Sequence, residues 1–277
     1  MGYPAAQAAL RFRDELTDFF RFLRHPRSAR RFPVRPTGQG WWLDWFAPLP
    51  WKRLLQWAGL LWLINALVFG PIAVSVAGMG GAQHRLDPTR IPWAQAILWA
   101  PIVEELVFRF ILRRPSQWLT VVPLAMVCMF KGPTWGMQAL LVLCLAVWIS
   151  RHTGFPRTPL PAGAGWFSRL LGAAQGRPWR FGAMRRYWRV FPWVFYALTL
   201  AFGALHLYNF QLNSMSWFLL PLLVLPQCVT GLVLAWMRVR RGIGASIVLH
   251  AIFNGGPVLL IMGLLKLFGG LDAGALQ

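Results

Sequence analysis

The sequence predicts an all-α protein, a polytopic bundle of transmembrane helices whose N-terminus lies in the cytoplasm. Of the 277 residues, 57% are hydrophobic and only 13% are charged, whereas soluble domains carry about 25% charged residues. Several apolar runs are also long enough to cross a bilayer. The net charge is +20, and the basic residues flank the apolar runs. This placement favours a lipid bilayer with anionic headgroups over nucleic acid as the partner.

Residues 1–53 form a basic segment before the first apolar run. They contain ten Lys and Arg residues, and Leu16, Phe19, Phe20 and Leu23 fall on one face at helical spacing. A basic helix with one apolar face is typical of a segment that lies on a membrane surface. We therefore expect 1–53 to be an amphipathic membrane-surface segment, distinct from the spans.

Residues 54–268 are predicted to form one transmembrane domain, followed by a tail at 269–277. We predict about seven spans, within a range of six to eight, at 54–77, 91–112, 117–130, 135–150, 191–210, 216–237 and 243–267. The third and fourth are short and are expected to form a hairpin that turns around Lys131 and Pro133. The basic stretch 151–189 is predicted to be a cytoplasmic loop.

The distribution of positive charge supports this topology. With the N-terminus inside, 23 of the 28 Lys and Arg residues fall in segments on the cytoplasmic side, and four fall on the outer side. Cytoplasmic segments of membrane proteins carry such an excess of Lys and Arg. We therefore predict a multi-pass protein of the plasma (inner) membrane.

Glu104 and Glu105 lie in the middle of the apolar run 91–112, where an ionisable group costs at least about 2.5 kcal/mol. Glu105 and Arg109 are four residues apart, so they share a helix face and can form an ion pair. Glu104 points elsewhere and has no charged partner at helical spacing. The pair is best explained as structural, and the unpaired Glu104 is the candidate for a reaction.

Two histidines also lie inside predicted spans. His206 falls in the span 191–210, and His250 shares a helix face with Asn254 in the span 243–267. A single histidine in a span often makes only an interhelical hydrogen bond. Together with Glu104, however, these groups supply a general base, a second proton carrier and donors for a developing oxyanion.

Three short motifs carry a resemblance to a known family. They read Glu104-Glu105-Leu-Val-Phe-Arg109, Phe202-Gly-Ala-Leu-His206 and His250-Ala-Ile-Phe-Asn254, in this order and each in a predicted span. The pattern resembles the CPBP intramembrane proteases, which are the CAAX prenyl protease and bacteriocin-processing enzymes, also called the Abi family. The resemblance covers roughly residues 91–267.

The resemblance implies an intramembrane endopeptidase that hydrolyses a peptide bond of a membrane-associated protein or peptide. Glu104 and His206 would hold and activate the water, while His250 and Asn254 would stabilise the tetrahedral oxyanion. The mechanism implied is of the glutamate type, without a metal or other cofactor.

The remaining motif residues, Glu105, Arg109 and Phe202, would be structural at the site. Two features depart from the family pattern: Phe110 stands where many members have Gly, and His206 follows Glu104 by 102 residues. An inserted segment at 117–189 explains the wide separation.

The depth of the site is predicted from residue counts. At about 1.5 Å per residue, Glu104 lies about 13 Å from a cytoplasmic helix end at Arg113. His206 fits this depth poorly, because it would lie about 22 Å from a helix start at Phe191. We expect the four catalytic candidates to meet in a cavity that opens to the cytoplasmic side.

Three alternatives remain open. A non-catalytic family member could act as a membrane scaffold or immunity protein, with the motifs kept for structure. A proton-coupled transporter could use Glu104 as its carrier, although no internal repeat supports this. A zinc site could be formed by Glu104, His206 and His250, whose residue types can bind zinc.

Overall fold

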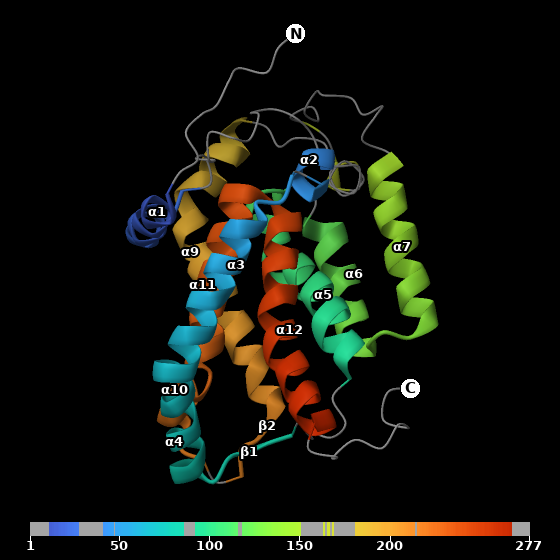
Figure 1. The fold of residues 1–277 in the computed structure, drawn as a ribbon. Coiled ribbons are helices and arrows are strands. Elements are labelled where there is room, and N and C mark those ends of the chain that lie inside the picture. The colour runs from blue at the N-terminus through green and yellow to red at the C-terminus, as the bar shows by residue number, and fades with distance from the viewer. Residues whose placement is uncertain are drawn as a thin grey trace.

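The seven segments predicted as spans are each largely helical in the computed structural model of the chain (Figure 1). In the first of these segments, α3 (Trp51–Ile64) continues through the π-turn η1 (Asn65–Phe69) into α4 (Gly70–Gly80). The second segment contains η2 (Gln95–Trp99), α5 (Ala100–Phe108) and η3 (Phe110–Leu112), and the next two are α6 (Trp118–Lys131) and α7 (Trp135–Ser150). The last three segments contain α9 (Phe181–Leu205) with η6 (His206–Asn209), then η7 (Trp217–Leu219), α10 (Leu220–Leu223) and α11 (Leu225–Arg241), and finally α12 (Ile243–Leu267). Two short helices, α1 (Phe12–Arg24) and α2 (Trp41–Phe46), precede them.

The structure describes residues 11–27, 41–46, 48–85, 92–115, 118–150, 181–213 and 215–267, together with Gly163, Gly165, Trp166 and Ser168. The predicted tail 269–277 and most of the predicted loop 151–189 lie outside these residues. The last part of that loop belongs instead to α9, which begins at Phe181, ten residues before the predicted span.

The all-α prediction agrees with the structure. By length and composition, however, fewer of the described segments qualify as membrane spans than the seven predicted. Among the described residues, Trp51–Gly80, Phe181–Asn209 and Ile243–Leu264 are long and apolar enough to cross a membrane. A fourth span results if Trp217–Leu223 and Leu225–Arg241, which are bent by 51° to each other, count as one. Helices α6 and α7 are apolar but shorter, so the seven-span count and the cytoplasmic N-terminus stay predictions.

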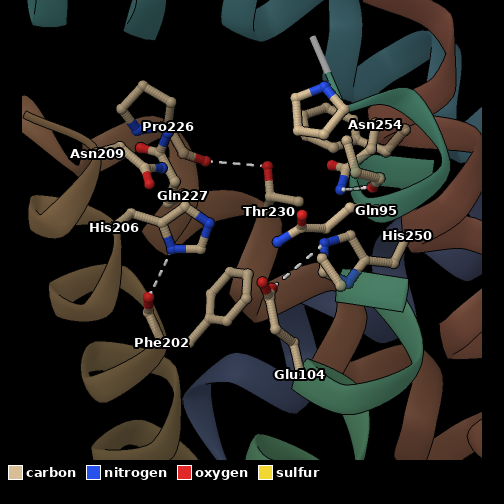
Figure 2. A pocket seen from close by; sticks show the side chains of 14 residues that line it. Gln95, Glu104, Phe202, His206, Asn209, Pro226, Gln227, Thr230, His250 and Asn254 are labelled. Carbon is tan, nitrogen blue, oxygen red and sulfur yellow. Dashed lines mark hydrogen bonds and ion pairs between the residues drawn. The ribbon is translucent and has the colours of Figure 1, made fainter. Parts of the chain in front are cut away.

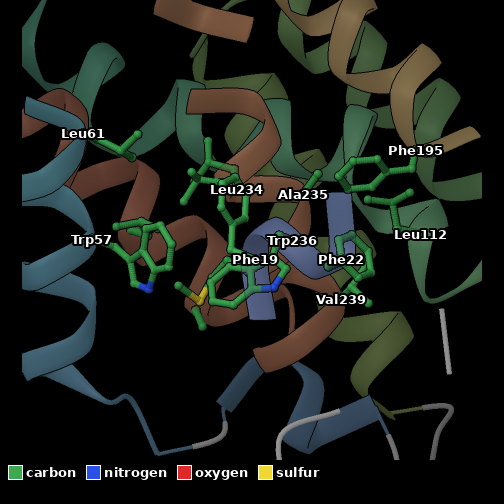
Figure 3. Packing of buried hydrophobic residues seen from close by; sticks show 14 of the residues in the cluster. Phe19, Phe22, Trp57, Leu61, Leu112, Phe195, Leu234, Ala235, Trp236 and Val239 are labelled. Carbon is green, nitrogen blue, oxygen red and sulfur yellow. The ribbon is translucent and has the colours of Figure 1, made fainter. Parts of the chain in front are cut away.

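Helix α1 packs against the bundle. Phe19 lies edge-on to Trp57 of α3 and to Trp236 of α11, and Phe22 lies edge-on to Phe195 of α9 (Figure 3). Of the predicted apolar face, Phe19 is buried, Leu16 and Leu23 are partly buried, and Phe20 is exposed. The face predicted to rest on lipid therefore contributes largely to the protein core.

Acidic side chains fix this N-terminal region to the arginines at the end of α11. Asp18 accepts hydrogen bonds from Arg240, at 2.7 and 2.9 Å, and from the indole of Trp236. Asp44 of α2 pairs with Arg238 at 2.7 Å. Glu15 pairs in the same way with Arg241 and Arg53. Because desolvated arginines are costly when unpaired, these carboxylates allow α11 to end in a buried basic cluster.

The hairpin of α6 and α7 supports the helix that carries Glu104. It turns at Gly132, whose φ of +72° favours glycine, as the sequence predicted. Val121, Ala125 and Cys128 of α6 pack with Val103 and other buried residues of α5 in one hydrophobic cluster. The hairpin α6–α7, which is the first part of the predicted insertion 117–189, is thus part of the core behind the motif helix.

A short ribbon that the sequence did not predict joins two connections at the end of the bundle opposite α2 (Figure 1). Strands β1 (Gln83–His84) and β2 (Phe210–Gln211) pair antiparallel, with His84 opposite Phe210. The backbone N–H of Arg85 extends the pairing to the carbonyl of Asn209 at 2.8 Å. The ribbon therefore ties the connection after α4 to the end of α9.

Loss of the buried Asp44–Arg238 pair should destabilise the protein. Asp44 is 3% exposed and Arg238 is fully buried, and removal of one partner of such a pair costs about 3–5 kcal/mol. We expect Asp44→Asn to lower the midpoint of thermal unfolding in detergent strongly. The matched control is Asp14→Asn, whose ion-pair partner Arg13 is exposed, and the amide oxygen of Asn can still accept from the backbone N–H of Arg11. This change should cost no more than about 1 kcal/mol. Equal shifts for the two variants would show that Asp44 does not hold this end together.

Candidate active site

The helix that carries Glu104 begins with an irregular turn. The residues before Pro101 form the π-turn η2, in which an N–H bonds the carbonyl five residues earlier. Pro101 has no N–H, so it leaves the carbonyl of Ala96 without this donor. The side-chain amide of Asn254 on α12 donates to the carbonyl of Ala96 in this turn at 3.0 Å. A π-turn is frequent at functional sites, and here a predicted catalytic residue holds it.

The four predicted catalytic residues line one cavity of about 390 Å³. Figure 2 shows Glu104 from α5, His206 from η6 just after α9, and His250 from α12 directed toward a common space. Asn254 borders the same space, and Phe202 lies beside it. Several further lining residues were not predicted from the sequence, namely Gln95, Asn209, Pro226, Gln227 and Thr230.

His250 lies between the two glutamates. Its Nδ1 is 3.1 Å from Oε1 of Glu105, and its Nε2 is 3.8 Å from Oε2 of Glu104. A carboxylate can only accept, so the hydrogen of this bond belongs to Nδ1 of His250. Nε2 is therefore the nitrogen that faces the cavity and Glu104.

His206 is oriented in the same manner by its own helix. Its Nδ1 is 2.8 Å from the carbonyl of Phe202, one turn earlier. Since a carbonyl also only accepts, Nδ1 carries the hydrogen and Nε2 is left for the cavity. The ring of Phe202 touches His206 edge-on, with the centroids 4.6 Å apart, and so limits the movement of the imidazole.

The predicted ion pair between Glu105 and Arg109 is present and buried. Nη1 of Arg109 is 3.2 Å from Oε1 of Glu105, and both side chains are at most 1% exposed. The second oxygen of Glu105 accepts a hydrogen bond from Ser246 of α12. Sequence spacing revealed the contact with Arg109 but not those with His250 and Ser246, because the latter two cross between helices.

Arg109 also supports Phe202. The guanidinium carbon lies 3.7 Å from the centroid of the Phe202 ring, which is a cation–π contact. Gly231 of α11 makes room for the stack, because a Cβ there would come within 3.0 Å of the ring. The residues predicted to be structural thus connect α5, α9 and α11 beneath the cavity.

Trp62 of α3 contacts the turn of α12 that contains Asn254. Pro257 cannot donate to the carbonyl of Phe253, and the indole N–H of Trp62 donates to that carbonyl instead, at 2.9 Å. Gly256 permits this approach, since a Cβ there would lie 2.2 Å from the Trp62 ring. Trp62 therefore fixes the turn that contains Asn254.

The described residues contain no group of three or more His, Cys, Asp and Glu side chains arranged to hold a metal ion. Glu104, His206 and His250, the three residues named for a zinc site, line the cavity without forming such a group. The prediction that the protein works without a metal or other cofactor stays a prediction.

The direction in which the cavity opens differs from the prediction. Pro92, Gln95 and Asn209 are its exposed residues, and they lie at the end of the bundle where β1 and β2 pair. Phe202 and Thr230, which are buried, lie deeper. The arginine-rich end, which we predicted to be cytoplasmic, is the opposite end. The two predictions of a cytoplasmic arginine-rich end and of a cavity open to the cytoplasm are therefore not both correct.

The comparison with protein families agrees with the three motifs. A family model described as "Type II CAAX prenyl endopeptidase Rce1-like" matches residues 87–256, which is more than half of the chain. The chain belongs to this family. No curated protein and no solved structure matches the chain.

The Rce1-like match includes all seven residues that we predicted for the site, from Glu104 to Asn254, and also the hairpin α6–α7. Membership places the chain in a family of CAAX-type peptidases within the CPBP group, and the apolar helices identify a membrane protein. Helices α1 to α4 lie before the matched range.

A double-mutant cycle tests the role of Trp62. We expect Trp62→Phe to leave the carbonyl of Phe253 without a partner, at a cost of about 1–3 kcal/mol. In a Pro257→Ala background the restored N–H of residue 257 can bond this carbonyl, so the same substitution should cost less. Thermal melts of the four proteins in detergent measure the difference, and the smaller ring of Phe affects both backgrounds alike. An equal cost in both would contradict the assignment.

Proposed function

We propose that the protein is an intramembrane endopeptidase that hydrolyses a peptide bond of a membrane-associated protein or peptide. The observation that carries this proposal is the position of Glu104, a carboxylate at the edge of a cavity within apolar helices, facing Nε2 of His250 and sharing the cavity with His206 and Asn254. Membership of the Rce1-like family supports the same reaction class.

In the proposed reaction, Glu104 and His206 hold a water molecule between them. Both can accept a hydrogen bond, Glu104 through its carboxylate and His206 through Nε2. Glu104 removes one proton as the water oxygen forms a bond to the carbonyl carbon of the substrate, and the carbonyl π electrons move to oxygen. This is general base catalysis by a positioned carboxylate.

His250 and Asn254 stabilise the resulting oxyanion in this proposal. Asn254 has two amide hydrogens, of which one is bonded to Ala96 and one is left to donate. His250 donates from Nε2 when both of its nitrogens are protonated, and the adjacent carboxylate of Glu105 balances that positive charge. Donors fixed in advance in a site of low polarity lower the barrier most effectively.

Collapse of the intermediate completes the hydrolysis. The oxyanion electrons re-form the C=O bond, the C–N bond breaks, and the departing amine takes the proton that Glu104 holds. One peptide bond and one water thus give a carboxyl group and an amine. We place this activity in the plasma (inner) membrane, because the excess of arginine at one end of the bundle matches the charge rule for that membrane.

The two adjacent glutamates provide the decisive test. Glu104→Gln keeps the shape but removes the base, so cleavage should fall by about 100-fold or more with little change in thermal stability. Glu105→Gln should instead lower the melting temperature, because it leaves the buried charge of Arg109 without its carboxylate, a loss of about 3–5 kcal/mol. Adding Arg109→Gln should restore part of that stability.

The measurement is a cleavage assay in proteoliposomes, with a fluorogenic prenylated CAAX-type peptide and a pool of single-span membrane peptides, beside melts in detergent. If Glu104→Gln keeps its cleavage activity and melts early, or if Glu105→Gln melts as the parent protein does, the two roles have been assigned the wrong way round.

Metal analysis tests the mechanism separately. We expect purified, active protein to contain no stoichiometric zinc, because Asn254 is a poor zinc ligand and the other three residues do not form a metal-holding group. Elemental analysis before and after treatment with a chelator, with cleavage measured on the same samples, checks this. About one zinc per chain, lost together with activity in His206→Ala, would replace the glutamate mechanism with a metal-dependent one.

A further inference from the structure

The mouth of the catalytic cavity is formed at one end of the bundle. Pro92 and Gln95 lie at the start of η2, Asn209 ends η6, and Pro226 lies at the start of α11. The ribbon of β1 and β2 is next to them, since Asn209 directly precedes β2 and its carbonyl accepts from the backbone of Arg85. In Figure 2, Asn209 and Pro226 lie on the side of the space away from Phe202 and Glu104.

The cavity is closed in the other direction by packed side chains. Beneath Glu104, the described structure places Glu105, Arg109 and Phe202, each at most 1% exposed. Arg238 of α11 then donates to the carbonyls of Arg109 and Phe110, at 3.1 and 3.3 Å. These buried groups lie between the cavity and the arginine-rich end.

The two ends of the bundle differ sharply in positive charge. The closed end holds the last turn of α11 with Arg238, Arg240 and Arg241, the first turns of α9 with three more arginines, and α1. At the open end, the described Lys and Arg residues are Arg85, Lys131 and Lys266. The bias of Lys and Arg, rather than the net charge, sets orientation in a membrane, so the closed end belongs in the cytoplasm.

We propose that the substrate reaches Glu104 from the extracytoplasmic side, and that the bond cleaved lies in the extracytoplasmic half of the membrane. The inference rests on the proposed function and adds to it the side of access. Its physical basis is that the exposed lining residues of the cavity lie at the ribbon end, whereas buried groups lie between the cavity and the arginine-rich end.

The chemistry of the mouth indicates the class of substrate. Pro92, Gln95, Asn209 and Pro226 carry no charge, and Gln227 behind them has a buried side-chain oxygen without a hydrogen-bond partner. Such an oxygen can accept from a peptide N–H. The substrate is therefore a polypeptide segment with an uncharged cleavage region on the extracytoplasmic side of a membrane-associated protein, recognised through its backbone.

Single cysteines report the side of access without requiring cleavage. In full-length protein with Cys128, Cys144 and Cys228 replaced by Ala, we introduce Gln95→Cys or Asn209→Cys at the mouth. The matched control is Arg185→Cys in the exposed first turns of α9. A membrane-impermeant maleimide is added to right-side-out and inside-out vesicles, and each variant is first checked by its thermal melt.

We expect both mouth cysteines to be labelled in right-side-out vesicles and not in inside-out vesicles, and the control to show the reverse. Labelling of a mouth cysteine on the same side as the control, or labelling of both mouth cysteines from the cytoplasmic face, overturns the proposal. Loss of the proposed peptidase activity is distinguishable from this result, because it would appear in the cleavage assay with the labelling pattern unchanged.

Discussion

The buried carboxylate of Glu105 is the interaction on which the rest of the site depends. One of its oxygens contacts both Arg109 and His250, and the other accepts from Ser246, whose hydroxyl also lies 2.9 Å from the carbonyl of Leu234. Through these contacts a single charge joins α5, α11 and α12, and Arg109 extends the connection to Phe202 on α9. A buried charge is tolerated only where partners satisfy it from several directions, so the network both requires this helix arrangement and fixes it. Because the contacts of Glu105 fix α5 to the neighbouring helices, the adjacent Glu104 can face the cavity.

The walls of the cavity are built from places where helices are interrupted. Pro101 and Pro257 each leave a backbone carbonyl without its usual donor, and in an apolar environment such groups need another partner. Asn254 supplies one in the turn before Glu104, and Trp62 supplies one for the carbonyl of Phe253. The cost of two irregular turns is thereby offset by side chains that also position the site. At the opposite end of the bundle, the acidic residues of α1 and α2 pair with the arginines of α11. These pairs offset the cost of burying the arginines there.

Much of the site could be predicted from the sequence, and the reasons for the omissions are physical. An isolated carboxylate such as Glu104 is costly in an apolar run, and Glu105 and Arg109 stand four residues apart, so both features are visible along one helix. Contacts between helices have no such signature: Ser246 looks like a small residue in an apolar segment, and the bond between His250 and Glu105 joins positions 145 apart. That the cavity opens at the end opposite the arginines was also not predicted, since α9 begins ten residues before the predicted span and carries His206 farther from the arginine-rich end. The packing of α1 in the core could not be predicted from the sequence. Its segment is rich in arginine, which is typical of a membrane surface, and Glu15 and Asp18 gave no sign of partners on α11.

The central claim is that Glu105 and the carbonyl of Phe202 hold the two histidines with Nδ1 directed into the protein and Nε2 directed into the cavity. Nitrogen-15 NMR of histidine-labelled protein in lipid bilayers tests this directly, without a substrate. The chain has five histidines, and spectra of His206→Gln and His250→Gln assign the two signals. We predict that Nδ1 carries a hydrogen in both rings. A ring at either position with a hydrogen on Nε2 and none on Nδ1 would contradict the account.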